Sequence, residues 1–280
     1  MTLSDAKPGA AGGYDFSYEQ FDTPLMQRHR REAYGQDIGQ HSWVTAEEMM
    51  LDIPRLRLTP SSRLLDLGSG PGGPLTFLAL RAGCSATGID LSPAAIASAT
   101  ARAASLGLGD RVDARVGDSN DPLPFPSGSF DAAVSIDVVL HLRDRSAVFR
   151  EVARILATGG RFLFTDAGVV SGAVSEAEAA RRSIHGFTRF VPPGFNERCL
   201  EGAGLRLVES ADRTEALIAS AKGRLASRIA HREELEAVEG AERFASQRSY
   251  LETVIALSER GAVSRMMYLA EAVTAGTRRM

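Results

Sequence analysis

The sequence contains few cysteines and almost no lysine. Its only cysteines are Cys84 and Cys199 among 280 residues, too few for a disulfide scaffold or a thiolate metal site and typical of a reducing compartment. Lysine occurs only at Lys7 and Lys222, so arginine supplies 30 of the 32 basic residues. Because arginine is so common along the chain, arginines such as Arg181, Arg182 and Arg189 are weak support for a binding role.

The sequence also lacks a strong net charge and a long apolar run. Its net charge of −3 provides no long-range field to gather nucleic acid. No apolar run approaches the roughly 18 residues of a membrane-spanning helix, and the N-terminus lacks the pattern of a signal peptide. The chain contains no HxH or HExxH pattern of metal ligands. We therefore expect a cytoplasmic protein that has no nucleic-acid, membrane or metal partner.

Composition divides the chain into five parts. Residues 1–13 are small and polar and predict a disordered leader. Residues 14–56 scatter aromatic side chains among charges and predict a lid of short amphipathic helices. Residues 57–213 carry the regular pattern of a core domain, and residues 214–260 are an Ala-, Glu- and Arg-rich helical insertion. Residues 261–280 hold the last strand and a tail.

Local signals refine the lid and the insertion. Thr45 followed by Glu48 is a capping box, which predicts a helix from there to about Ile53, where Pro54 ends it. A two-residue turn would suffice to connect the last two strands, so the insertion is expected to cover the active-site end or to form an oligomer contact. We accordingly expect a monomer or a homodimer.

Short strand patterns alternate with longer helix patterns from residue 63 onward. This alternation is typical of a parallel sheet whose crossover helices cover both faces. We predict an α/β fold with a seven-stranded, mostly parallel sheet. Its strands are expected over residues 63–67, 85–90, 112–117, 131–136, 161–166, 205–210 and 264–272.

A glycine-rich turn follows the first predicted strand. The string LLDLGSGPGG places Gly68, Gly70 and Gly72 between that strand and a helix that begins near Pro74. Glycines allow a ligand to approach the backbone closely, and a helix N-terminus attracts an anionic group. The pattern is not the GxxxxGK[ST] of a P-loop, because no lysine is near. The turn therefore predicts a nucleotide-like ligand other than a nucleoside triphosphate.

Two acids follow the next two strands. Asp90 ends the second strand about twenty residues after the glycine turn, where a carboxylate can accept both hydroxyls of an adenosine ribose. Asp118 follows the third strand, where it can bind an adenine amino group with Ser119 beside it. A dinucleotide oxidoreductase does not require this second acid.

With these features in this order, the sequence resembles the class I S-adenosylmethionine-dependent methyltransferases, which have a Rossmann-like fold. The strings LDLGSGPGG, TGIDLSPAAI, GDSNDPLPFPSGSFDAAVS and VARILATGGRFLFTD carry the resemblance, which is strong from about residue 63 to 210. It implies S-adenosylmethionine as cofactor and S-adenosylhomocysteine as product. It also implies that the cofactor site includes, besides the glycines, Asp90, Asp118 and Ser119, the residues Gln40, Asp66, Leu91 and Ile136.

The segment after the fourth strand holds the candidate catalytic residues. In SIDVVLHL, Asp137 and His141 lie just past the carboxyl edge of the sheet, and they share one face if the segment is helical. A histidine suits a general base at neutral pH, and Asp137 could orient it. The alternative is that His141 only packs beneath the next helix.

The same segment resembles the small-molecule branch that includes phosphoethanolamine N-methyltransferases and natural-product methyltransferases. In that branch an aspartate and a histidine at these positions act with a tyrosine of the lid, which Tyr18 in YEQF matches best. The stretch HGFTRFVPPGF could supply His185, Phe187, Phe190 and Phe195 to the wall of a substrate pocket, and His41 and Trp43 of the lid could face it too. Packing around a helix N-terminus at Pro192 and Pro193 explains the first four side chains at least as well, and packing of the lid onto the sheet is the better explanation of His41 and Trp43.

We therefore predict a methyltransferase that acts on an oxygen, nitrogen or carbon nucleophile of a small molecule, in specialised metabolism. A different hypothesis is a protein that binds the cofactor without transferring a methyl group, as a pseudoenzyme, a sensor or a catalyst of another reaction. A nicotinamide oxidoreductase is a third, which Asp118 disfavours.

Overall fold

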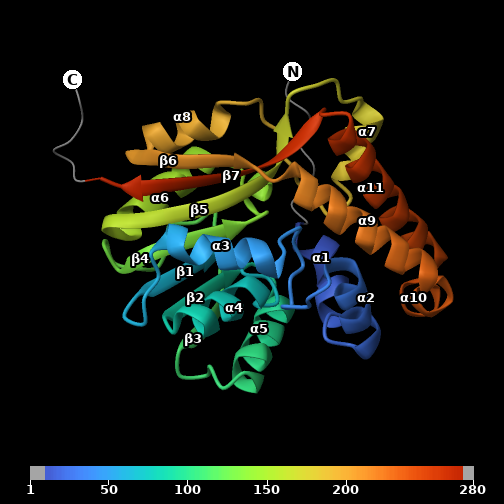
Figure 1. Cartoon of the computed structure of the whole chain (residues 1–280), viewed down its shortest axis with the longest axis horizontal. Coiled ribbons are helices and arrows are strands. Elements are labelled where there is room, and N and C mark those ends of the chain that lie inside the picture. The colour runs from blue at the N-terminus through green and yellow to red at the C-terminus, as the bar shows by residue number, and fades with distance from the viewer. Residues whose placement is uncertain (1–9, 274–280) are drawn as a thin grey trace.

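A computed structural model describes residues 10–273 of the chain. Its centre is one seven-stranded sheet with the strand order β3-β2-β1-β4-β5-β7-β6 (Figure 1). The strands are β1 Arg63–Leu67, β2 Ser85–Asp90, β3 Val112–Val116, β4 Phe130–Ile136, β5 Leu156–Val170, β6 Leu205–Asp212 and β7 Val263–Ala272.

The sheet is mostly parallel, as the alternating sequence pattern predicts. β1 pairs in parallel with β2 and with β4, and β3 and β5 extend the sheet in parallel on either side. Only β7 runs the other way, inserted between β5 and β6. The predicted fold class is confirmed, although β5 is longer than the predicted residues 161–166.

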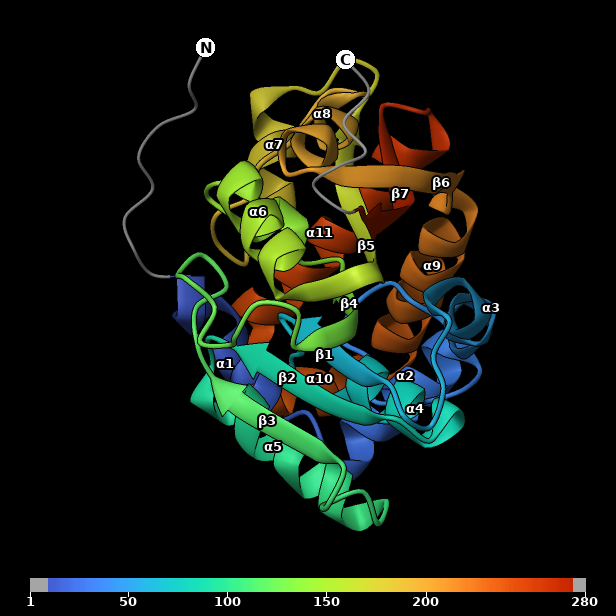
Figure 2. The same ribbon diagram turned by 90° about the vertical axis from the view of Figure 1, so that its left-hand side faces the viewer.

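Helices cover both faces of the sheet. On one face lie α3 (Ala46–Leu56), α4 (Gly73–Ala82) and α5 (Pro93–Ser105), and on the other α6 (Arg145–Ile155) and α8 (Phe195–Gly202). Figure 2 shows α3 and α6 on opposite sides of the twisted sheet. Strand residues alternate between the two cores: Leu64 packs in the first and Leu65 in the second. Because both faces are covered, the central strands are apolar on both sides.

The capping box of α3 forms as predicted, but the helix ends later than predicted. Thr45 accepts from the N–H of Glu48, and Glu48 accepts from the N–H of Thr45. Pro54 lies inside the helix, which continues to Leu56. A proline within a helix cannot donate to the carbonyl four residues earlier, and its ring pushes that carbonyl aside. That carbonyl belongs to Met50, an exposed residue, so water can replace the lost donor.

The lid and the insertion lie at the same end of the molecule. The lid helices α1 (Ala10–Glu19) and α2 (Pro24–Tyr34) lie beside α9 (Thr214–Ala230), α10 (Arg232–Glu239) and α11 (Ala241–Glu259) (Figure 1). α2 packs closely on α9, because a Cβ atom on Gly223 would lie 2.3 Å from the carbonyl oxygen of Ala33. Of the predicted leader, residues 1–9 lie outside the described residues, and the remainder begins α1 instead of being disordered.

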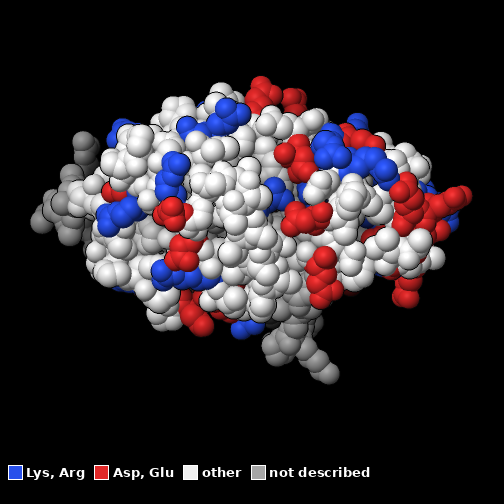
Figure 3. Space-filling view, turned by 90° about the horizontal axis from the view of Figure 1, so that it is seen from below, with Lys and Arg blue, Asp and Glu red and all other residues white. Residues whose placement is uncertain are grey.

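The surface carries charges of both signs. On the face shown in Figure 3, basic and acidic side chains are interspersed among larger uncharged areas. None of the helices within residues 10–273 combines the length and the apolar character that crossing a bilayer requires.

Candidate active site

A cavity of about 780 Å³ lies beyond the carboxyl ends of the parallel strands. It lies where the strand order reverses between β1 and β4, the position at which open α/β sheets bind ligands. All the site residues predicted from the sequence except Gln40 and Gly72 line this cavity. The predicted residues that line it are Tyr18, Asp66, Gly68, Gly70, Asp90, Leu91, Asp118, Ser119, Ile136, Asp137 and His141.

The glycine turn after β1 depends on left-handed backbone angles. Gly68, Gly70 and Gly72 have φ angles of 76°, 52° and 79°, which cost little only for glycine. A Cβ atom on Gly72 would lie 2.8 Å from that of Ala99 on α5. Gly72 therefore allows the turn to pack against α5 and to start α4, whereas Gly68 and Gly70 face the cavity.

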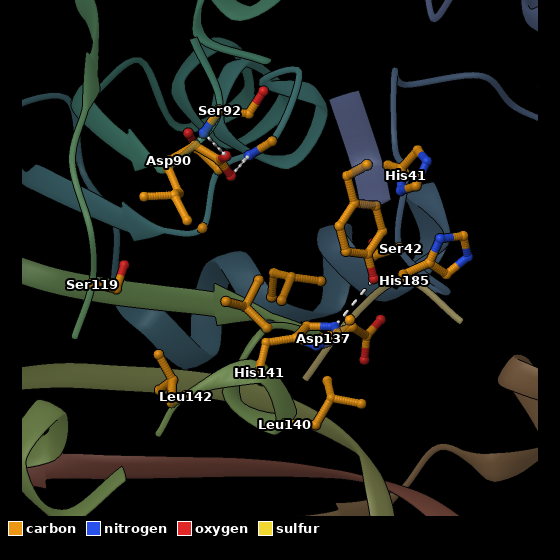
Figure 4. Close-up of a pocket in the computed structure, with 18 of the residues that line it drawn as sticks. His41, Ser42, Asp90, Ser92, Ser119, Asp137, Leu140, His141, Leu142 and His185 are labelled. Carbon is orange, nitrogen blue, oxygen red and sulfur yellow. Dashed lines mark hydrogen bonds between the residues drawn. The ribbon is translucent and has the colours of Figure 1, made fainter. Parts of the chain in front are cut away.

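Asp90 joins the glycine turn to the end of β2. Its Oδ2 accepts from the N–H of Gly70 at 2.8 Å, and its Oδ1 accepts from the N–H of Ser92 at 2.9 Å (Figure 4). Each carboxylate oxygen can accept a further hydrogen bond. The geometry therefore fixes the carboxylate at the cavity wall and leaves it able to accept ribose hydroxyls.

Asp66, at the end of β1, is a carboxyl group held away from water. It is 1% exposed, and burial, together with the negative charge of Asp90, raises its pKa to about 8. The hydroxyl oxygen of the adjacent Ser69 is buried without a hydrogen-bond partner in the described part of the chain. A buried carboxyl group and a buried hydroxyl group without a hydrogen-bond partner favour a polar or cationic ligand that forms hydrogen bonds with them.

The loop after β3 completes this end of the cavity. Oδ1 of Asp118 accepts from both the backbone and the side-chain N–H of Asn120, each at 2.8 Å, and Ser119 lies beside it. Leu91 is 44% exposed, and Ile136 is buried at the end of β4. Acids that can bind hydroxyl and amino groups, next to apolar side chains, fit the adenosine and amino-acid parts of S-adenosylmethionine.

His141 lies on the opposite side of the cavity, in the short 3₁₀ turn Val139–His141 (Figure 4). Its Nδ1 lies 2.8 Å from the carbonyl oxygen of Phe187. A carbonyl oxygen only accepts, so Nδ1 carries the proton and the neutral ring presents Nε2 as an acceptor. Nε2 lies 3.2 Å from the hydroxyl of Tyr14. Burial lowers the pKa of His141 below its usual 6.5, so the ring is neutral at pH 7.

Asp137 has other partners than His141. Its φ angle of 58° places it in the left-handed region, so it does not share a helical face with His141. Its carboxylate accepts from Nε of Arg265 (2.8 Å), from the hydroxyl of Thr165 (2.8 Å) and from the N–H of Trp43 (3.0 Å). The expectation that Asp137 orients the histidine is therefore not supported; the carbonyl of Phe187 does this.

Of the remaining predicted residues, Tyr18 lies at the cavity and Gln40 lies outside it. Tyr18 lies over the glycine turn, where a Cβ atom on Gly70 would lie 3.7 Å from its hydroxyl. Its ring stacks on that of Tyr14 with centroids 5.9 Å apart. Gln40 is buried outside the cavity. Its side chain forms hydrogen bonds with the neighbouring backbone: it accepts from the N–H of Ile38 and donates to the carbonyl of Gln36.

Several cavity residues escaped the sequence analysis. Tyr14 lies four residues before Tyr18 on α1 and hence on the same face, a spacing that could have suggested it. Arg224 and Tyr250 also line the cavity without a sequence signal. Arg182 lines it too, although its presence in an arginine-rich chain was weak support for a binding role. Of the six side chains considered for a substrate wall, four line the cavity: His41, Trp43, His185 and Phe187. Phe190 and Phe195 are not among its lining residues, and Phe195 packs against the core on the α6 side of the sheet instead.

Residues 65–164 match a family model described as "Methyltransferase domain". This range holds the glycine turn, both acids and His141. A ubiquinone biosynthesis O-methyltransferase from Xanthomonas axonopodis is 33% identical over 166 residues, covering 56% of this chain and 68% of that protein. The chain belongs to the class I S-adenosylmethionine-dependent methyltransferases. The cofactor of this family is S-adenosylmethionine, which is converted to S-adenosylhomocysteine.

Other relatives match over shorter shares of their length. Methyltransferase GfsG from Streptomyces halstedii is 34% identical, covering 58% of this chain and 59% of its own. The 27-O-demethylrifamycin SV methyltransferase from Amycolatopsis mediterranei is 33% identical over 54% and 56%. The chain thus spans only a little more than half the length of these two relatives.

Solved structures share the fold. A phosphoethanolamine N-methyltransferase from Haemonchus contortus superimposes with a TM-score of 0.80 at 20% identity, covering 96% of this chain and 61% of that one. At this identity the likeness establishes the shared architecture alone.

Proposed function

We propose that this chain transfers a methyl group from S-adenosylmethionine to an oxygen, nitrogen or carbon atom of a small molecule, with His141 as general base. One observation carries the proposal. The bond from Nδ1 to the Phe187 carbonyl fixes the tautomer, so Nε2 of a neutral His141 is the acceptor. This atom faces the same cavity as the acids Asp66, Asp90 and Asp118.

When bound, the cofactor supplies an electrophilic methyl on a sulfonium, which an in-line nucleophile displaces. Gly68, Gly70 and Asp90 would hold its amino-acid and ribose parts, and Asp118 its adenine. The enzyme must then align the acceptor and remove a proton from it. Nε2 of His141 takes that proton, and the Phe187 carbonyl oxygen, which accepts from Nδ1–H, stabilises the positive charge of the ring.

Tyr14 occupies the position from which an acceptor would reach His141. Burial raises the pKa of the Tyr14 hydroxyl above its usual value, so the group stays protonated and donates to Nε2. Because Tyr14 is on α1, movement of this lid helix would free Nε2 for the acceptor and then exclude water from the closed cavity.

The experiment is a calorimetric titration with S-adenosylmethionine and S-adenosylhomocysteine, followed by a screen of small-molecule acceptors for S-adenosylhomocysteine release. Binding together with release on one acceptor class supports the proposal. Binding without release on any acceptor supports a protein that only holds the cofactor or catalyses another reaction. A chain that binds neither compound contradicts both.

The setting of the enzyme is part of the proposal. The likeness to a methyltransferase that acts on 27-O-demethylrifamycin SV supports a role in specialised metabolism. Cys84 and Cys199 are both buried and free, which fits the cytoplasm. The insertion supplies Arg224 and Tyr250 to the cavity, which supports a covering role for it in a monomer or a homodimer.

A further inference from the structure

Three arginines line the cavity, and in the described part of the chain none of them has a carboxylate partner. Arg143 is exposed to solvent, whereas Arg182 and Arg224 are at least partly buried. Arg182 ends α7 (Glu176–Arg182) and Arg224 lies in α9. Within residues 10–273 no carboxylate oxygen lies within 4.0 Å of either group. This sets them apart from Arg145 and Arg265, whose buried charges are compensated by Asp166 and Asp137.

Neutral groups hold both arginines in place. Arg182 is 4% exposed and donates to the hydroxyl of Tyr250 at 3.0 Å and to the carbonyl of Ala167 at 2.9 Å. The guanidinium of Arg224 lies over the ring of Trp43, 4.8 Å from its centroid. These contacts orient the two groups but leave their positive charges uncompensated in a partly enclosed site, which is costly unless an anion binds there.

Both charges act on the Tyr14–His141 pair, Arg182 on both residues and Arg224 on Tyr14. Burial raises the pKa of Tyr14, and the charges of Arg182 and Arg224 act in the opposite direction. Burial lowers the pKa of His141, and the charge of Arg182 adds to this effect. Asp66, Asp90 and Asp118 line the other side of the cavity, and Figure 4 shows Asp90 and Ser119 well separated from His141. Asp137 lies on the His141 side, but its charge is compensated by Arg265. The cavity is thus acidic where the cofactor fits and basic where the acceptor would bind.

We propose that the methyl acceptor carries an oxyanion, a carboxylate or a phosphate ester, which Arg182 and Arg224 bind. This inference rests on the proposed function, because it gives the chemical class of the acceptor for the same site. A guanidinium matches either oxyanion through paired N–H donors. The aromatic rings of Trp43 and Tyr250 beside the two arginines provide apolar contact for the rest of the molecule.

The test uses the full chain saturated with S-adenosylhomocysteine and three calorimetric probes: benzoate, phenyl phosphate and the neutral benzamide. At least one anion should bind at least about tenfold more tightly than benzamide, since a charge-assisted hydrogen bond contributes a factor of roughly 10 to 100. Arg224→Gln should lose about tenfold or more of that affinity. Arg182→Gln should do the same, but Arg182 is buried, so Arg224→Gln keeps the test decisive if the other variant does not fold.

Lys222→Gln is the matched control, because Lys222 lies on the same helix with its side chain 57% exposed and paired with Glu259. It removes the same charge outside the cavity and should leave the affinity unchanged. Equal binding of benzamide and both anions, no binding of any probe, or an equal loss in Lys222→Gln would each overturn the inference. If S-adenosylhomocysteine itself does not bind, the proposed function fails before any probe is added, so the two failures are distinguishable.

Discussion

The hydroxyl of Tyr14 lies 3.2 Å from Nε2 of His141, although the two residues are 127 positions apart in the chain. The Tyr14 ring also stacks on His185, with centroids 4.7 Å apart. The lid helix α1 therefore reaches the loop after β4 directly, and in this arrangement its Tyr14 occupies the proposed base.

His141→Ala should lower turnover by roughly 10² to 10⁴, because the proton acceptor is lost. The affinity for S-adenosylmethionine should change little, since His141 lies away from the acids of the cofactor side. Single-turnover rates and calorimetry measure the two quantities separately. A comparable loss of both would indicate that His141 is structural.

The pH profile of the wild-type enzyme should fall on its acid side at a pH below 6.5. Burial lowers the pKa of His141, so the ring loses its capacity as a base only when the pH drops through this lowered pKa. Rate measurements from acid to neutral pH check this, and the His141-dependent limb should vanish in His141→Ala. A limb centred above 6.5 would contradict the assignment.

Tyr14→Phe and Tyr18→Phe form a matched pair on one helix. Tyr14→Phe removes the hydrogen bond to Nε2 and should change kcat and shift the acid limb to higher pH, because donation to Nε2 favours the neutral ring. Tyr18→Phe keeps that hydrogen bond and should leave the acid limb in place. The same shift in both variants would mean that α1 acts through packing alone.

Asp90→Asn should weaken binding of S-adenosylmethionine about tenfold or more. The substitution removes the charge that accepts from Gly70 N–H and Ser92 N–H and that would accept the ribose hydroxyls. Asp113→Asn, at an exposed position on β3, is the control. Unchanged affinity in Asp90→Asn, measured by calorimetry, would refute the ribose assignment.

Asp66 should make the protein less stable as the pH rises. Its pKa is about 8 in the folded chain, against about 3.8 when exposed, so the folded state binds the proton more tightly. The free energy of unfolding should therefore fall between about pH 4 and pH 8, by up to a few kcal/mol. Urea unfolding across this range should show a smaller decline in Asp66→Asn. An identical decline in both proteins would show that Asp66 is not responsible.

The sequence by itself determined the features that depend on near neighbours. The glycine turn needs φ angles that only glycine adopts at low cost, the capping box of Thr45 and Glu48 closes within one helical turn, and the strand pattern alternates with the helix pattern. Asp90 and Asp118 follow strands whose carboxyl ends meet at one edge of a parallel sheet, so their convergence on one site was also predictable.

Only the tertiary structure decided which residues meet across the cavity. Asp137 pairs with Arg265, 128 positions away, and Tyr14 rather than Tyr18 bonds to His141. Pro54, which was expected to end α3, is tolerated inside the helix because the carbonyl that loses its donor belongs to Met50, an exposed residue. Such outcomes depend on how helices pack, as where Gly223 allows α9 to touch α2. One sequence pattern is compatible with several such packings, and complementary shape selects among them.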